Sequence, residues 1–250
     1  MGETAKTNTD NLCERIMSNR GTLDLNQWID SQLNFTTNCR ILELCCGTGS
    51  QTQLLVNKSR SVVASDISEK SLEVLNSNII MEFATNLQTI QGDIDYINFE
   101  NNSFDIIFCA YGIYYSKNLK ALLNKFNKWL TTYGMIIIVC PYGNNNKDIF
   151  NLLRNSEVVI DEFSNYVSSL YVYNELLPQL LELKNTTIIK TAVNEVVWNT
   201  PNQFLNYWRN TTFYDRSKEK QVELNINKHF KNNPTFINKK DIVYIESYNK

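Results

Sequence analysis

The chain has 250 residues, of which 43% are hydrophobic and 20% are charged, a composition typical of a globular protein with a sizeable core. Its formal net charge of −2 gives no general attraction to nucleic acids or to anionic membranes. No apolar stretch approaches the roughly 18 residues that a membrane span needs. The polar character of residues 1–35 leads us to expect no secretory signal.

The cysteine pattern favours neither a disulfide framework nor a metal site. Six cysteines are scattered through the sequence without a C-x-x-C pair, and His229 is the single histidine. Four of the cysteines fall in or beside apolar runs, where cysteine behaves as a small hydrophobe. We therefore expect reduced thiols, no metal and a cytoplasmic location.

In chain order, the first expected elements are two short amphipathic helices, around residues 12–17 and 25–33. Short apolar runs then alternate with stretches of helical spacing. The runs that predict strands are residues 40–44, 61–65, 87–91, 104–110 and 135–140. The clearest helical patterns place apolar residues three or four apart, at Leu72, Leu75, Ile79 and Phe83 and at Leu119, Leu122, Phe126 and Leu130.

This alternation predicts an α/β fold, with a parallel sheet and helices on both of its faces. Crossovers between parallel strands are right-handed, so the loops that follow the strands meet at one edge of the sheet. Ligands bind at that edge in folds of this kind.

After the fifth strand, residues 144–183 predict a helical insert, which Pro178 should break or kink. The elements expected beyond it are a strand at residues 188–198, helices over residues 201–208 and 218–230, and a last strand at residues 241–248. The sequence shows no linker long enough to separate domains. We expect a single domain with a helical lid (1–37), a cofactor-binding core (38–142), a helical insert (143–185) and a carboxy-terminal part that completes the sheet (186–250).

The sequence I-L-E-L-C-C-G-T-G at residues 41–49 indicates a strand that runs into a ligand-binding loop. Gly47 and Gly49 have no Cβ, so backbone amides there can approach a ligand, and we expect a helix to begin near Ser50. The spacing does not fit a P-loop, and it matches the dinucleotide fingerprint at one position in three. By itself the loop is a weak signal.

Acidic residues at the ends of the next two strands strengthen this signal. Asp66 ends the second strand in A-S-D-I, nineteen residues after Gly47, and Asp93 follows the third strand in Q-G-D-I. A carboxylate at such a strand end can accept two hydrogen bonds from a ribose diol. The three features together predict a nucleoside-binding edge.

These segments resemble the class I S-adenosylmethionine-dependent methyltransferases over about residues 38–142. E-L-C-C-G-T-G is similar to their glycine-rich first motif, S-D-I to their ribose-binding acid and G-D-I to their adenine-contacting acid. S-F-D-I-I-F-C-A-Y is similar to their fourth strand and its active-site loop, and W-L-T-T-Y-G-M-I-I-I-V to the helix, turn and strand that follow. The resemblance implies a Rossmann-like, mostly parallel seven-stranded sheet with an antiparallel hairpin at one edge.

The resemblance also implies S-adenosylmethionine as the cofactor, S-adenosylhomocysteine as its product, and no metal. The residues implied to contact the cofactor are Glu43, Cys45, Gly47, Gly49, Asp66, Ile67, Asp93, Ile94 and Ala110.

The sequence departs from the family pattern at its first glycine, where it has Cys45. Some quinone-biosynthesis C-methyltransferases have a cysteine there, and C-A-Y-G-I-Y-Y-S-K-N has a faint likeness to their fourth-strand loop, although their carboxy-terminal signatures are not evident. The nucleobase-binding and Pro-Cys motifs of nucleic-acid methyltransferases are missing after the fourth strand. We therefore expect methyl transfer to a nitrogen or oxygen of a small molecule. A carbon in a quinone-like ring is one alternative, and a noncatalytic cofactor-binding partner protein is another.

Tyrosines are the expected residues on the acceptor side. Tyr111 and Tyr115 can orient the methyl acceptor, and contacts to it are expected from Tyr114, Tyr142 and Trp208. His229 suits a general base by type, but its basic, polar helix favours a solvated histidine. The expected partner is a small molecule, with no nucleic acid and no membrane, and the oligomeric state stays open. Residues 12–33 and 144–183 should close over the cofactor and exclude water.

Overall fold

The computed structural model describes residues 8–18, 21–79, 85–184 and 186–249. The chain forms two compact units. We call the first the sheet unit; it comprises Leu25–Cys140, Tyr171–Thr191 and Val243–Lys250. The second, the helical unit, comprises Met1–Asp24, Pro141–Leu170 and Ala192–Ile242.

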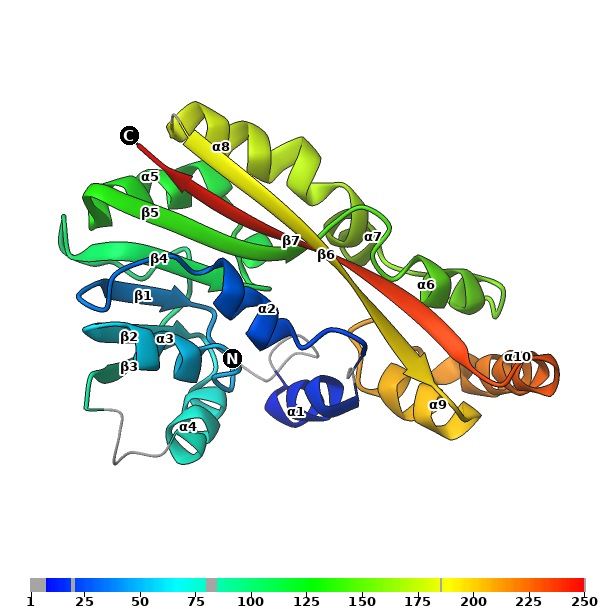
Figure 1. The fold of residues 1–250 in the computed structure, drawn as a ribbon. Helices are drawn as coiled ribbons and strands as arrows, with labels where there is room; N and C mark the ends of the chain where they lie inside the picture. Colours follow the sequence, from blue (N-terminus) through cyan, green and yellow to red (C-terminus); the bar gives the residue numbers. More distant parts are fainter. Residues whose placement is uncertain (1–7, 19–20, 80–84, 185, 250) are drawn as a thin grey trace. The chain divides into compact units, whose positions relative to one another are not determined.

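The strands of the described residues form one seven-stranded sheet in the order β3-β2-β1-β4-β5-β7-β6 (Figure 1). They are β1 (Arg40–Leu44), β2 (Ser61–Asp66), β3 (Leu87–Gln91), β4 (Phe104–Ala110), β5 (Leu130–Pro141), β6 (Thr186–Trp198) and β7 (Phe236–Tyr248). The four pairs among the first five strands, β1–β2, β1–β4, β2–β3 and β4–β5, are parallel. The sheet as a whole is mostly parallel, which confirms the fold that the sequence predicts.

Register brings the ends of the central strands to the same level. Leu44, the last residue of β1, lies opposite Ser65 of β2 and Cys109 of β4. On the other side of β2, Asp66 lies opposite Gln91, the last residue of β3. The loops that leave these four strands therefore start at a single edge of the sheet unit.

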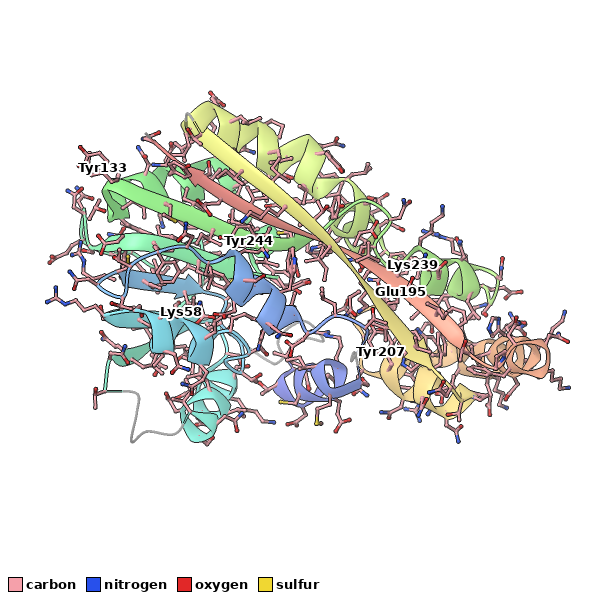
Figure 2. All side chains as sticks on the ribbon, viewed as in Figure 1. Lys58, Tyr133, Glu195, Tyr207, Lys239 and Tyr244 are labelled. Carbon is pink, nitrogen blue, oxygen red and sulfur yellow. The ribbon has the colours of Figure 1, made fainter. Side chains whose placement is uncertain are left out.

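Helices cover both faces of the sheet unit (Figure 1). They are α2 (Leu25–Gln32), α3 (Thr52–Lys58), α4 (Glu69–Asn78), α5 (Leu119–Trp129) and α8 (Leu177–Leu183), with a short 3₁₀ turn η1 (Ile113–Tyr115) after β4 and a π-helical turn η2 (Val172–Leu176) before α8. Helix α5 buries its apolar face and packs against α8. Tyr244, on β7, is labelled in Figure 2. Its ring packs edge-on against that of Trp28 of α2, with the ring centroids 6.4 Å apart.

The helical unit has its own apolar core. Its helices are α1 (Thr9–Ser18), α6 (Lys147–Arg154), α7 (Glu162–Ser169), α9 (Pro201–Arg209) and α10 (Glu219–Asn232), with a 3₁₀ turn η3 (Arg216–Lys218) before α10. Buried side chains of α6, α9 and α10 pack with Val196 and Trp198 of β6. An ion pair of 3.3 Å joins Glu195 on β6 to Lys239 on β7 (Figure 2).

Most elements expected from the sequence are present, and the differences have local causes. Strand β5 begins at Leu130, so Leu130 leaves the helical pattern in which the sequence placed it. The insert is not one helix, because Glu157 adopts a left-handed φ of 61° and a non-helical segment follows, in which Val158 and Ile160 are buried. Pro178 stands in the first turn of α8, directly after the π-helical turn η2.

Phe83 lies outside the described residues. No helix of the described residues is long and apolar enough to cross a membrane. Within the helical unit, α1 packs against α9 and Gly21 forms a β-bridge with Val196.

The division into lid, core, insert and carboxy-terminal part stays a prediction, and so does closure of the lid.

Candidate active site

The glycine loop after β1 is held by the acid at the end of β2. Asp66 accepts hydrogen bonds from the Gly47 amide through Oδ2 and from the Ser68 amide through Oδ1, both at 2.9 Å. Burial raises the pKa of Asp66, although these backbone hydrogen bonds oppose the shift. A carboxylate has about four lone-pair positions, so the backbone amides do not exhaust its capacity to accept a ligand hydrogen bond.

Three residues of the glycine loop have left-handed backbone conformations, with φ of 56° at Cys45, 54° at Gly47 and 87° at Gly49. The cysteine therefore takes up the conformation for which the family pattern has glycine, at a cost of about 1–2 kcal/mol. Its thiol is neutral, because a hydrogen bond with Cys109 and burial raise the pKa of Cys45 well above its ordinary value.

Gly49 has a structural reason to be glycine. A Cβ at this position would lie 2.8 Å from Cγ of Leu75, a fully buried side chain of α4. The expected reason for this glycine was close approach of a ligand. The structure adds a second one, which is that α4 packs directly against the loop.

We expect Gly49→Val to lower the free energy of unfolding by about 2–4 kcal/mol, because it combines a left-handed φ with overpacking against Leu75. Chemical denaturation of the variant measures this loss. The matched test compares Gly49→Ala, Leu75→Ala and the double variant Gly49→Ala/Leu75→Ala. The double variant should lose less free energy of unfolding than the two single variants together, because the new Cβ no longer meets the leucine side chain. Strict additivity would contradict the contact.

Gly112 is a site residue that sequence reasoning missed. A Cβ at Gly112 would overlap the Cβ of Cys45, and it would also lie 3.3 Å from the sulfur of Cys109. The loop after β4 therefore packs directly on the glycine loop after β1. The signal was present in the letters A-Y-G after the fourth strand, but the partner of this glycine could not be read from them.

Glu43 is the most unusual ionisable group at this edge. Its side chain is 2% exposed, and its Oε2 atom has no hydrogen-bond partner among the described residues. Burial raises the pKa of Glu43 to about 8; the nearby Thr52 hydroxyl opposes this shift, and the Asp66 charge adds a smaller increase. At neutral pH this carboxyl group is mainly protonated in the folded protein.

The loop after β3 carries Asp93 and also Asp95, which sequence reasoning missed. Asp93 Oδ1 accepts the amide hydrogen of Asp95 at 2.9 Å, which shapes the turn. Asp95 in turn accepts hydrogen bonds from Ser116 Oγ at 2.5 Å and from the Lys117 amide at 2.8 Å. Ile94 is buried, whereas the expected cofactor contact Ile67 is 46% exposed at the end of β2.

The expected acceptor-side tyrosines of the sheet unit follow β4. Tyr111, directly after Ala110, has a left-handed φ of 56° and donates its backbone N–H to the carbonyl of Val139 at 2.8 Å. Burial raises the pKa of the Tyr111 hydroxyl, so it stays protonated. Tyr114 packs against Tyr115 with ring centroids 4.8 Å apart, and against Tyr171 at 6.1 Å.

The other expected substrate residues belong to the helical unit. Trp208 is fully buried in its core, and its indole N–H donates to the Phe213 carbonyl at 3.3 Å. Tyr142 donates its backbone N–H to the carbonyl of Asp241 at 3.2 Å. His229 contacts the Thr235 carbonyl through Nε2 at 2.8 Å. A substrate role for Tyr142 or Trp208 stays a prediction.

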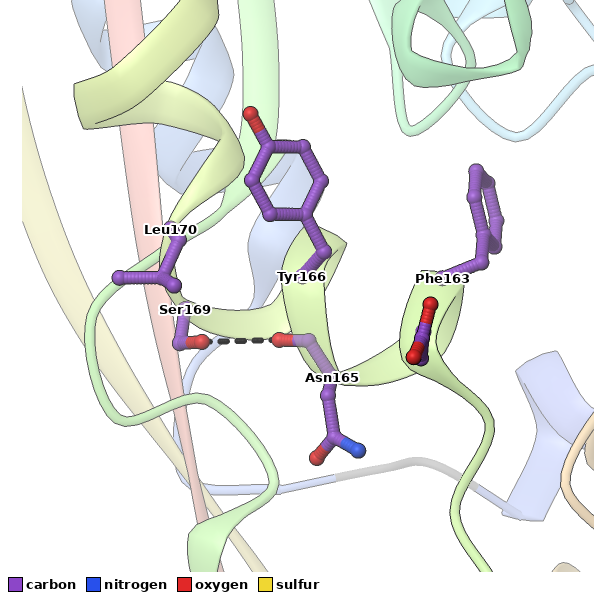
Figure 3. Close-up of a pocket in the computed structure, with 6 residues that line it drawn as sticks. Phe163, Asn165, Tyr166, Ser169 and Leu170 are labelled. Carbon is purple, nitrogen blue, oxygen red and sulfur yellow. Dashed lines mark hydrogen bonds between the residues drawn. The ribbon is translucent and has the colours of Figure 1, made fainter.

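An open groove of about 520 Å³ follows α7 in the helical unit (Figure 3). Phe163, Tyr166 and Leu170 are among its lining residues, and the Ser169 hydroxyl donates to the backbone carbonyl of Asn165 at 2.8 Å. None of its lining residues is a predicted site residue, and we assign it no chemical role.

Comparison with known proteins finds matches to the segment that carries the glycine loop and the acids. Residues 41–134 match the family model described as a methyltransferase domain. A demethylmenaquinone methyltransferase of Lactococcus lactis is 31% identical over 106 residues, which are 41% of this chain and 42% of that protein. The matched segment therefore spans less than half of this curated relative.

Solved structures share the fold over much more of the chain. The YcgJ protein of Bacillus subtilis has a TM-score of 0.64 at 14% identity, covering 90% of this chain and 97% of its own. A phospholethanolamine N-methyltransferase of Haemonchus contortus, solved with S-adenosylhomocysteine, has a TM-score of 0.60 at 14% identity, covering 99% of this chain and 59% of its own. At these identities the likeness shows the fold alone.

Proposed function

We propose that this chain, whose residues 41–134 match a methyltransferase domain, transfers a methyl group from S-adenosylmethionine to a nitrogen or oxygen of a small molecule. The observation that carries the proposal is the edge of the sheet unit, where the glycine loop, Asp66 and the Asp93 loop meet in the order and spacing of the family. The domain supports the reaction class, and the choice of acceptor atom is our own inference.

The residues at this edge fit the cofactor. Asp66 keeps capacity to accept beyond the hydrogen bonds that hold the loop, which suits a ribose hydroxyl group. Glu43 has an oxygen without a partner among the described residues, so a donor on a ligand can satisfy it. The exposed Ile67 offers an apolar surface of the kind that a purine covers.

When bound, S-adenosylmethionine supplies a methyl group on a positively charged sulfur, which is already an activated leaving group. The protein's contribution is then to align the acceptor and to exclude water, which can be worth on the order of 7–11 kcal/mol. Tyr115 is 38% exposed at the end of η1 and can donate a hydrogen bond to an acceptor. Tyr111 is buried and protonated, so it can orient a group but is a poor base.

Because the Tyr111 hydroxyl stays protonated, it favours a methyl acceptor that needs no strong base. An amine that binds in its neutral form has a free electron pair, whereas a hydroxyl group must first lose its proton. Among small nucleophiles we therefore place nitrogen first.

The second candidate is methylation of carbon in a quinone-like ring. The curated relatives are named demethylmenaquinone methyltransferases, and the sequence has Cys45 where some quinone C-methyltransferases have cysteine. However, the match spans 41% of this chain and 42% of the Lactococcus lactis protein, so it carries less weight for the acceptor than for the cofactor.

The proposal is tested by incubating the protein with radiolabelled S-adenosylmethionine and a set of candidate acceptors. These are metabolite extracts, demethylated quinones, RNA, DNA and other proteins. We expect label in a small polar molecule, and chromatography with mass spectrometry then identifies the methylated atom. Label in the quinone fraction would favour the second candidate. Label mainly in macromolecules would overturn both candidates, and tight cofactor binding without transfer would indicate a noncatalytic partner protein.

A further inference from the structure

The segment after β4, residues 111–118, is attached to both halves of the cofactor edge; we call it the acceptor loop. At one end, Gly112 packs on Cys45 of the glycine loop so closely that a Cβ would overlap it. At the other end, Ser116 and Lys117 donate hydrogen bonds to Asp95 of the loop after β3. The two tyrosines expected to face the acceptor, Tyr114 and Tyr115, lie between these two attachments.

Asp95 is itself held rigidly. Its amide donates to Oδ1 of Asp93, the acid expected at the adenine, two residues earlier. Its backbone carbonyl accepts from Lys125 Nζ of α5 at 2.6 Å, and the same ammonium group donates to the Ile97 carbonyl at 3.2 Å. These contacts connect the Asp93 turn to the Asp95 carboxylate and, through it, to the acceptor loop.

The Asp95 hydrogen bonds are not needed to start α5. Asn118 caps that helix with its own side chain, which accepts the Ala121 amide at 3.0 Å. The donors to Asp95 precede the cap, at the end of η1. Helix capping therefore leaves both carboxylate contacts unexplained.

We propose that Asp95 is a positioning residue that couples occupation of the adenine side of the site to the order of the acceptor loop, and thereby to the placement of Tyr114 and Tyr115. This proposal rests on the proposed function, because it takes the cofactor to bind beside Asp93. The carboxylate acts through the loop and does not itself contact the reacting atoms.

Hydrogen exchange of residues 111–118, measured by mass spectrometry with and without S-adenosylhomocysteine, tests the coupling. In the parent protein we expect the ligand to slow exchange of this loop by about tenfold or more, in line with charge-assisted hydrogen bonds. In Asp95→Ala we expect calorimetric affinity for S-adenosylhomocysteine within about threefold of the parent, but no added protection of the loop. Asp95→Asn keeps one acceptor oxygen and should give an intermediate result.

Ser116→Ala provides a milder second variant in case Asp95→Ala unfolds, and it should lose part of the protection. The matched control is Asp105→Ala at the opposite end of β4, where the carboxylate accepts hydrogen bonds from Arg40 and Thr131. It should lower stability and leave ligand-induced protection of the acceptor loop as in the parent.

The outcomes separate the two proposals. If the parent protein does not bind S-adenosylhomocysteine, the proposed function fails and the coupling fails with it. If the ligand binds and protects the loop equally in the parent, Asp95→Ala and Ser116→Ala, the coupling alone is overturned.

Discussion

We expect the free energy of unfolding to fall by about 1 kcal/mol for each pH unit between pH 5 and pH 8, and the substitution Glu43→Gln to abolish most of this decline. The cause is the buried Glu43 carboxyl group at the end of β1, whose pKa is raised to about 8 by burial. A carboxyl group in an unfolded chain titrates near pH 4.3. Folding therefore favours the protonated form of this side chain.

The direction of the effect follows from proton binding. Below about pH 4.3 the group is protonated in both states, and the stability it contributes is fully present. As the pH rises toward 8, the unfolded chain releases the proton while the folded protein keeps it, so unfolding becomes more favourable. Over this interval the loss sums to about 3–4 kcal/mol.

Urea denaturation of the parent and of Glu43→Gln at several pH values measures the effect. The difference between the two proteins isolates this group, because other carboxyl groups titrate in both. We expect nearly equal stabilities at pH 4.5 and an advantage of about 2–4 kcal/mol for the glutamine variant at pH 8. Parallel curves would show that Glu43 is solvated or paired in the folded protein.

The framework of the site could be predicted because its causes are local in sequence. Apolar runs of the right length gave the strands, and right-handed crossovers then required their loops to share an edge. Asp66 and Asp93 could be assigned to that edge because each directly follows such a run, and the register of β1, β2 and β3 confirms that their strand ends are level. No contact with a residue distant in the sequence was needed to assign these two acids to the edge.

Contacts between loops could not be predicted in this way. Gly112 must be glycine because a Cβ there would overlap Cys45. Asp95 accepts hydrogen bonds from Ser116 and Lys117, which belong to another loop. Neither pairing has a spacing rule, since each depends on how far two separate loops extend beyond the sheet. Gly49 shows the same limit, because its contact with Leu75 depends on the position of α4.

The second large effect concerns the acid at the end of β2. We expect Asp66→Ala to weaken binding of S-adenosylhomocysteine by at least about tenfold, because hydrogen bonds from a buried diol to a carboxylate are worth roughly 1.5–3 kcal/mol each. The substitution also frees the Gly47 and Ser68 amides, which the carboxylate holds at 2.9 Å. Loss of these contacts should loosen the glycine loop and add to the loss of affinity.

Isothermal titration of three variants separates these contributions. Asp66→Asn keeps one acceptor oxygen, which is too few for the Gly47 and Ser68 amides and the ribose hydroxyl groups together. Its affinity for S-adenosylhomocysteine should therefore lie between those of the parent and the alanine variant. Asp105→Ala removes a carboxylate that accepts from Arg40 and Thr131, on the same sheet but away from this edge, and its affinity should equal that of the parent. If Asp66→Ala bound the ligand as tightly as the parent, the carboxylate would serve the glycine loop alone, and the ribose would have to bind elsewhere.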